Sequence, residues 1–155
     1  MYKKDEVQQL RKEFWASFSN YTKFYSQKVG EPIQWLLYRT GIKGIELKFD
    51  LENKIIRVAL EVNCKSDDRR FDIYIELDRY RKIIETGFDN KLLWFDDFKL
   101  PEGKMVSRVH IEMHELNYYN SENWPEIFKF MAENMHALQT NFIEILPILE
   151  DKFEV

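Results

Sequence analysis

Apolar residues recur with a helical period at both ends of the chain. Over residues 4–28 they stand three or four positions apart, at Val7, Leu10, Phe14, Phe18, Tyr21 and Tyr25. This spacing gathers them on one face of a helix. Gly30 and Pro32 mark its end, because Gly is common just past a helix and Pro cannot continue one. A second long stripe begins near Trp124, and Pro147 is expected to kink or end that helix.

Between these helices, short apolar or alternating runs predict strands at 33–39, 45–51, 55–63, 91–99 and 105–116, with a helix at 67–87. The order is therefore α-β-β-β-α-β-β-α. It predicts an α+β fold in one domain, residues 1–155. We expect a mixed five-stranded sheet, with the first three strands consecutive and antiparallel, packed by the long terminal helices.

The runs 45–51 and 55–63 favour a hairpin. Each has one wholly apolar face, and a two-residue loop at Glu52-Asn53 would pair Phe49 with Ile56. A longer loop around the same register is the alternative. In this register Glu46 lies opposite Ala59 and diagonal to Glu61.

Charge and cysteine content restrict the function classes. The 155-residue chain has a formal net charge of −4, which opposes the approach of a polyanion, although a local basic patch remains open. Cys64 is the sole cysteine, so no intrachain disulfide is available, and this fits a reducing compartment. The sequence has no signal-like apolar stretch and no membrane-length apolar run. We expect a cytoplasmic protein with no membrane association.

Three segments carry a resemblance to a known family. Glu13-Phe14-Trp15, the run WLLYRTGIKG from Trp35 to Gly44, and Ala59-Leu60-Glu61-Val62 together resemble an uncharacterised bacterial domain family. The likeness covers most of the chain. In that family the domain also follows nuclease-like segments in longer proteins. The resemblance implies a link to nucleic-acid metabolism or defence, and it supplies no catalytic residue.

One polar cluster has the chemistry of a metal-dependent nuclease. Restriction-endonuclease-like folds share the order αβββαβ and use an acidic residue on one strand and Glu-x-Lys on the next. Here the third predicted strand has Glu61 but carries Asn63 at the position of the lysine. The spacing Glu46-x-Lys48 is correct but occurs on the second strand. The core would therefore be a degenerate version of that fold. Glu46 and Glu61 are candidate Mg²⁺ ligands, and Lys48 completes the candidate catalytic set. The alternative is a solvated or covered face with ion pairs, including Arg57 to Glu46 and Asp50.

Two further patterns have structural alternatives. In 110–114 the polar residues His110, Glu112 and His114 share one strand face, but the two histidines stand about 13 Å apart, too far for one ion. His110 and Glu112 could share one, and a solvated strand face is the other interpretation. Most aromatic residues fit core positions, with Tyr118 and Tyr119 expected at the surface.

The sequence contains no GxSxG, Walker A or GxGxxG pattern, and no cofactor is expected. The function remains open. We favour a non-catalytic binding or interaction module in bacterial nucleic-acid-related or defence systems. A protein partner or self-association through the apolar helix stripes would fit, and net charge does not support nucleic acid as the partner. The alternative is the divergent Mg²⁺-dependent nuclease using Glu46, Glu61 and Lys48.

Overall fold

The computed structural model describes residues 3–35, 39–52 and 54–154. Its elements, in chain order, are α1 (Lys4–Val29), β1 (Ile45–Glu52), β2 (Ile55–Val62), α2 (Asp67–Arg79), α3 (Arg81–Ile84), β3 (Leu93–Lys99), β4 (Met105–His114), the 3-10 turn η1 (Ser121–Asn123) and α4 (Trp124–Phe153). The α+β class and both long terminal helices are confirmed.

The described strands form one four-stranded sheet in the order β1-β2-β4-β3, with every neighbouring pair antiparallel. The expected fifth strand and the mixed pairing are not confirmed. Of the run 33–39, the described residues 33–35 and 39 belong to no strand, and 36–38 lie outside the described part of the chain. The physical reason is packing, because Trp35 is buried against the rings of Phe18, Tyr25 and Phe49.

The β1–β2 hairpin forms, but its register differs by two residues from the expectation. Phe49 lies opposite Val58 rather than Ile56, and the connection is residues 53–54. A two-residue shift leaves every side chain on its expected face, so the apolar pattern cannot choose between the two registers. The charges distinguish the two registers. The expected register places Lys48 opposite Arg57, two like charges, whereas the observed register places Asp50 opposite Arg57.

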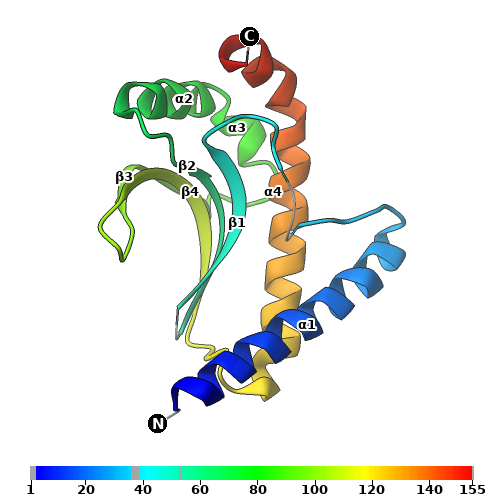
Figure 1. Ribbon diagram of the computed structural model, residues 1–155. Coiled ribbons are helices and arrows are strands. Elements are labelled where there is room, and N and C mark those ends of the chain that lie inside the picture. Colours follow the sequence, from blue (N-terminus) through cyan, green and yellow to red (C-terminus); the bar gives the residue numbers. More distant parts are fainter. Residues whose placement is uncertain (1–2, 36–38, 53, 155) are drawn as a thin grey trace.

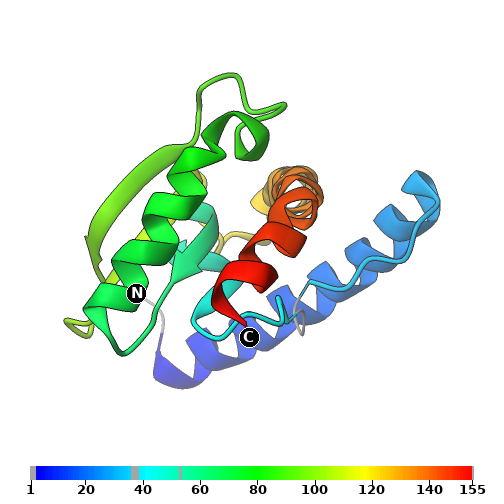
Figure 2. The ribbon, with the colours of Figure 1, turned by 90° about the horizontal axis from the view of Figure 1, so that it is seen from above.

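The helices lie on the apolar side of the sheet. Figure 1 shows α4 running the length of that side, with α1 crossing one end of α4 and α2 at the other end. Seen from above in Figure 2, α1 and α2 flank the line of α4. The sheet curls away from α4, so its polar face lies inside the bend (Figure 1). Seven of the eight residues of β2 are buried, on both faces of the strand.

Two helix boundaries correct the expectations. The helix predicted at 67–87 is interrupted at Tyr80, so that α2 and the short α3 take its place. The last helix continues through Pro147. Pro147 has no N–H for the carbonyl of Ile143, but both residues are exposed, and water can satisfy that carbonyl.

Among the described helices, none combines the length and apolarity that crossing a bilayer would take.

Phe18 connects three elements, because its ring from α1 contacts Phe49 of β1 and Phe128 of α4. It is 0% exposed, whereas Phe24 in the same helix is 62% exposed. We expect Phe18→Ala to lower the free energy of unfolding by about 3–5 kcal/mol, and Phe24→Ala to change it by about 0.5 kcal/mol or less. Urea denaturation of both variants measures the difference. Equal losses would mean that α1 is not docked as described.

Candidate functional site

The candidate nuclease residues come together on the polar face, with one change. Glu46 lies directly opposite Glu61, not opposite Ala59, as a consequence of the observed register. Glu61 is 1% exposed and Glu46 is exposed to solvent. Lys48 follows on the same face, half-buried. Of the two candidate metal ligands, Glu61 therefore lies inside the bend of the sheet and Glu46 lies at the surface.

Three nitrogen donors surround the buried Glu61 carboxylate. Arg108 Nη2 donates to Oε1 at 2.9 Å, and Asn63 Nδ2 donates to Oε2 at 3.1 Å. Lys48 Nζ lies 3.5 Å from the same Oε2. Arg108 is itself 1% exposed. The two buried charges thus compensate one another, as charges removed from water must.

Arg57 organises a second ion network beside the first. Its guanidinium donates to Glu112 at 2.6 Å, to Glu52 at 2.8 Å and to Asp50 at 3.1 Å. The expected pair with Asp50 is confirmed, and Glu46 is not among the partners. Arg108 also donates to Asp50 at 2.8 Å, so this carboxylate joins the two networks. Burial acts to raise the pKa of Asp50, but hydrogen bonds and attraction from Arg108 and Arg57 outweigh it, and the net pKa is lowered.

His110 is buried, so the expectation of a solvated strand face is wrong for this residue. It is 0% exposed and packs between the rings of Phe95 and Phe98, at 5.4 and 5.5 Å between centroids. Its Nε2 lies 3.2 Å from Glu112 Oε2 but makes no well-directed hydrogen bond among the described atoms. Burial lowers the pKa of His110 to about 4, against the attraction of Glu112.

Within the described residues, no cluster of three or more His, Cys, Asp or Glu side chains is arranged to hold a metal ion.

The described aromatic residues follow the core interpretation except Phe24, which is 62% exposed, and Tyr38 lies outside the described residues. Tyr118, expected at the surface, is 3% exposed, while Tyr119 is partly buried. The Tyr118 hydroxyl accepts a hydrogen bond from Arg11 Nε at 3.3 Å, and its ring packs on Phe14. A polar handle that finds a partner allows a tyrosine to be buried.

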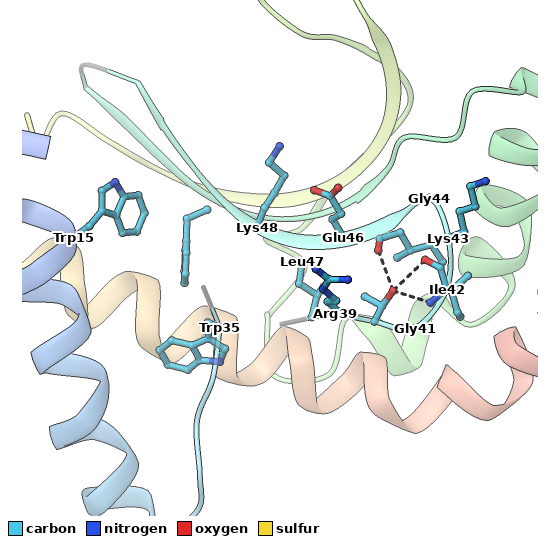
Figure 3. A pocket seen from close by; sticks show the side chains of 13 residues that line it. Trp15, Trp35, Arg39, Gly41, Ile42, Lys43, Gly44, Glu46, Leu47 and Lys48 are labelled. Carbon is cyan, nitrogen blue, oxygen red and sulfur yellow. Dashed lines mark hydrogen bonds between the residues drawn. The ribbon is translucent and has the colours of Figure 1, made fainter. Parts of the chain in front are cut away.

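A groove of about 640 Å³ lies along β1 and the loop that precedes it (Figure 3). We call it the edge groove. It is lined by Trp15 of α1 and Trp35, by the loop 39–44, and by the first half of β1, 45–49. In Figure 3 the side chains of Lys48 and Glu46 point to one side of β1, and Trp35 and Leu47 lie on the other.

The loop of the edge groove is held by specific contacts. The Thr40 hydroxyl donates to Ile45 O at 2.9 Å and accepts from Ile42 N–H at 3.1 Å. Gly44 has φ of +93°, and a Cβ at this position would lie 2.4 Å from Cys64 Sγ. Only glycine meets both conditions, so the tight turn into β1 depends on it.

The edge groove carries an excess of positive charge, although the chain as a whole is acidic. Arg39, Lys43 and Lys48 line it, against the single carboxylate of Glu46. The side chains of Arg39 and Lys43 make no ion pair with any described residue, while Lys48 lies near Glu61. Sequence reasoning interpreted 40–44 only as a turn. The cations were visible in the sequence, but nothing local indicates that Trp15 lies beside them.

The comparisons with known proteins assign a family and no activity. A family model described as a domain of unknown function (DUF4268) matches residues 10–146. No curated protein and no solved structure matches the chain. The edge groove and the ion networks are therefore interpreted from their own geometry.

Protonation of His110 should destabilise the fold. The folded pKa, about 4, lies below the ordinary histidine value, so the unfolded chain binds the proton first as pH falls. We expect the free energy of unfolding to decrease between pH 6.5 and 4, at up to about 1.4 kcal/mol per pH unit. Urea denaturation at several pH values measures this decrease.

His110→Leu should flatten the profile in this window. His114→Gln is the matched control, because the His114 side chain is 56% exposed and contacts the same Glu112. An unchanged slope in His110→Leu would contradict the assignment.

Proposed function

We propose that this chain, which belongs to the DUF4268 family of domains of unknown function, is a non-catalytic binding module. The observation that carries the proposal is the edge groove, where two tryptophans and three cations meet beside the outer edge of β1. The partner binds there and contributes negative charge.

The charge distribution supports a site of recognition. The chain as a whole has a net charge of −4, yet Arg39 and Lys43 lack an ion-pair partner among the described residues. An exposed cation without a partner is ordinary, but two beside a groove with aromatic walls form a surface that complements an anionic ligand. The buried Arg57 and Arg108, by contrast, each form ion pairs with carboxylates.

The setting we propose is a bacterial system that handles nucleic acids or defends against foreign ones. Its support is the resemblance to a domain that follows nuclease-like segments in longer proteins. We further propose a cytoplasmic location, which the single partly buried Cys64 fits.

Charge reversal in the edge groove tests the binding function. The probes are an octapeptide alternating valine and glutamate, its valine–lysine counterpart, and a twelve-residue oligo-dT. We expect an anionic probe to shift the amide signals of residues 40–49 in ¹⁵N NMR spectra. The double variant Arg39→Glu, Lys43→Glu should weaken that binding at least tenfold, or about 1.4 kcal/mol.

The control pair Lys82→Glu, Lys99→Glu makes the same change in net charge at exposed positions outside the groove. It should bind as the wild type does. If no probe shifts the 40–49 signals, or if both double variants lose binding equally, the edge groove is not the site.

A divergent Mg²⁺-dependent nuclease is the second candidate. The observation that favours it is the direct opposition of Glu46 and Glu61, with Lys48 Nζ 3.5 Å from Glu61. Directly opposed residues of a hydrogen-bonded pair have Cα atoms about 5.5 Å apart, close enough for two carboxylates to reach one ion. Arg108 and Asn63 also contact Glu61, and a metal would compete with them.

Single- and double-stranded DNA and RNA, incubated with Mg²⁺ or Mn²⁺, test this candidate. Glu46→Ala removes an exposed carboxylate without uncovering a buried charge, so loss of cleavage in a folded Glu46→Ala variant would support the nuclease. Glu150→Ala, also exposed but on α4, is the control. Absence of cleavage by the wild type on every substrate would leave the candidate without support.

A further inference from the structure

The outer edge of β1 has the geometry to accept another strand. In the antiparallel pair with β2, Asn63 N–H donates to Gly44 O at 2.8 Å, which fixes the phase of the ladder. Hydrogen-bonded pairs then alternate, so Glu46 and Lys48 direct their backbone groups toward β2. Leu47 and Phe49 direct theirs outward. No described segment pairs with this edge.

The loop before β1 closes one end of that edge. Ile45 N–H donates to Ile42 O at 3.1 Å, and Ile45 O accepts from the Thr40 hydroxyl. The outward groups of Ile45 are thus satisfied inside the chain. Pairing with a partner would begin at Leu47, beside the edge groove, and continue toward Glu52.

The opposite edge of the sheet is protected. β3 contains an irregularity between Phe95 and Phe98, where the ladder with β4 shifts. Asp96 and Asp97 are exposed there, and Asp96 O accepts from Arg70 Nη1 and from the Ser107 hydroxyl. Bulges and charges are ordinary means of preventing edge pairing. Within the described strands, only β1 offers a regular unpaired edge.

The aromatic walls suit side chains better than bases. Trp15 packs on Phe18 and Phe49, and Trp35 packs on Phe18 and Tyr25 while its Nε1 donates to Gln139. Trp35 is 5% exposed. Stacking of nucleic-acid bases needs open ring faces, and these rings pack on Phe18, Phe49 and Tyr25. They form instead an apolar wall on the same side of β1 as Leu47.

The loop already binds one carboxylate of this chain, that of Glu154. Lys43 N–H donates to Glu154 Oε1 at 3.2 Å, and Arg69 donates to the same oxygen at 2.9 Å. The Lys43 and Arg39 side chains remain without an ion pair in the described part of the chain. Both side chains line the edge groove and are available to a carboxylate of a partner that binds there.

We infer that the edge of β1 binds an extended peptide as a fifth strand. This inference rests on the proposed binding function and names its partner class. Alternate apolar side chains of the peptide face Trp15 and Trp35, and at least one carboxylate lies near Arg39 and Lys43.

Amide hydrogen exchange in the wild-type protein tests the inference. In the free protein, the Leu47 and Phe49 amides should exchange fast, whereas the Lys48 amide, bonded to β2, should be protected. The valine–glutamate octapeptide should slow exchange at Leu47 and Phe49 at least tenfold. Two further versions of the octapeptide carry N-methyl groups, one at the odd-numbered and one at the even-numbered peptide nitrogens. Only one of these two sets of nitrogens faces β1, so methylation of that set should abolish binding and methylation of the other should not.

Charge exchange provides a second arm. The variant Arg39→Glu, Lys43→Glu should prefer the valine–lysine peptide, and Lys82→Glu, Lys99→Glu should keep the wild-type preference. This reversal would locate the peptide carboxylates at the loop end of β1.

Several outcomes would overturn the strand inference. If a probe binds at 40–49 without protecting Leu47 and Phe49, or if only oligo-dT binds, strand addition is wrong while the binding function stands. If those amides are already protected in the free protein, the edge is occupied, and sedimentation at several concentrations tells whether a second copy covers it. If no probe binds at all, the binding function fails as well.

Discussion

The ion pair of Arg108 with Glu61 is the constraint on which the sheet depends. Both residues are 1% exposed, and Phe98 covers the Arg108 guanidinium at 4.6 Å from the ring centroid. A curled sheet with charges inside its bend is stable only if each charge has a partner, because one unpaired buried charge costs about 3–5 kcal/mol. Arg57 extends the pairing from β2 to β1 and β4 through Asp50 and Glu112. β1, β2 and β4 are thus joined by side chains as well as by backbone hydrogen bonds.

This pairing also explains why the apolar pattern alone misplaced the hairpin. Two registers bury the same faces, and they differ in which charges meet. The information was present in the sequence, as Arg57 can lie opposite either Lys48 or Asp50, and the attractive choice is the one observed. Helical periods, by contrast, predicted both ends of α1 and the start of α4 to within one residue, because many apolar positions act together. The strand predicted at 33–39 is not confirmed for its described residues, because a run of large apolar residues fits a strand and a core-filling segment equally well.

The candidate site was predictable only in part. The sequence brought Glu46, Lys48 and Glu61 to one face, but it could not tell that Glu61 is buried, since burial there comes from the curl of β3 and β4. His110 was misjudged for the same reason: alternation assigns a polar residue to the polar face, and only tertiary structure shows that this face is covered. The edge groove depends on Trp15 and the loop 39–44, which the fold brings together from different parts of the chain.

Because β1 is already paired with β2 from Ile45 to Glu52, a partner that binds at its outer edge need not order the strand first. The cationic loop adds direction to an otherwise repetitive ladder, since it distinguishes one end of β1 from the other.

The contact of Gly44 with Cys64 has an evolutionary consequence. These positions are twenty residues apart in sequence, yet a single methyl group at 44 would overlap the sulfur at 64. Any side chain at 44 would displace that sulfur, and the φ of Gly44 excludes one in any case. Across relatives that retain this turn, position 44 should therefore stay glycine even where the residue at position 64 changes.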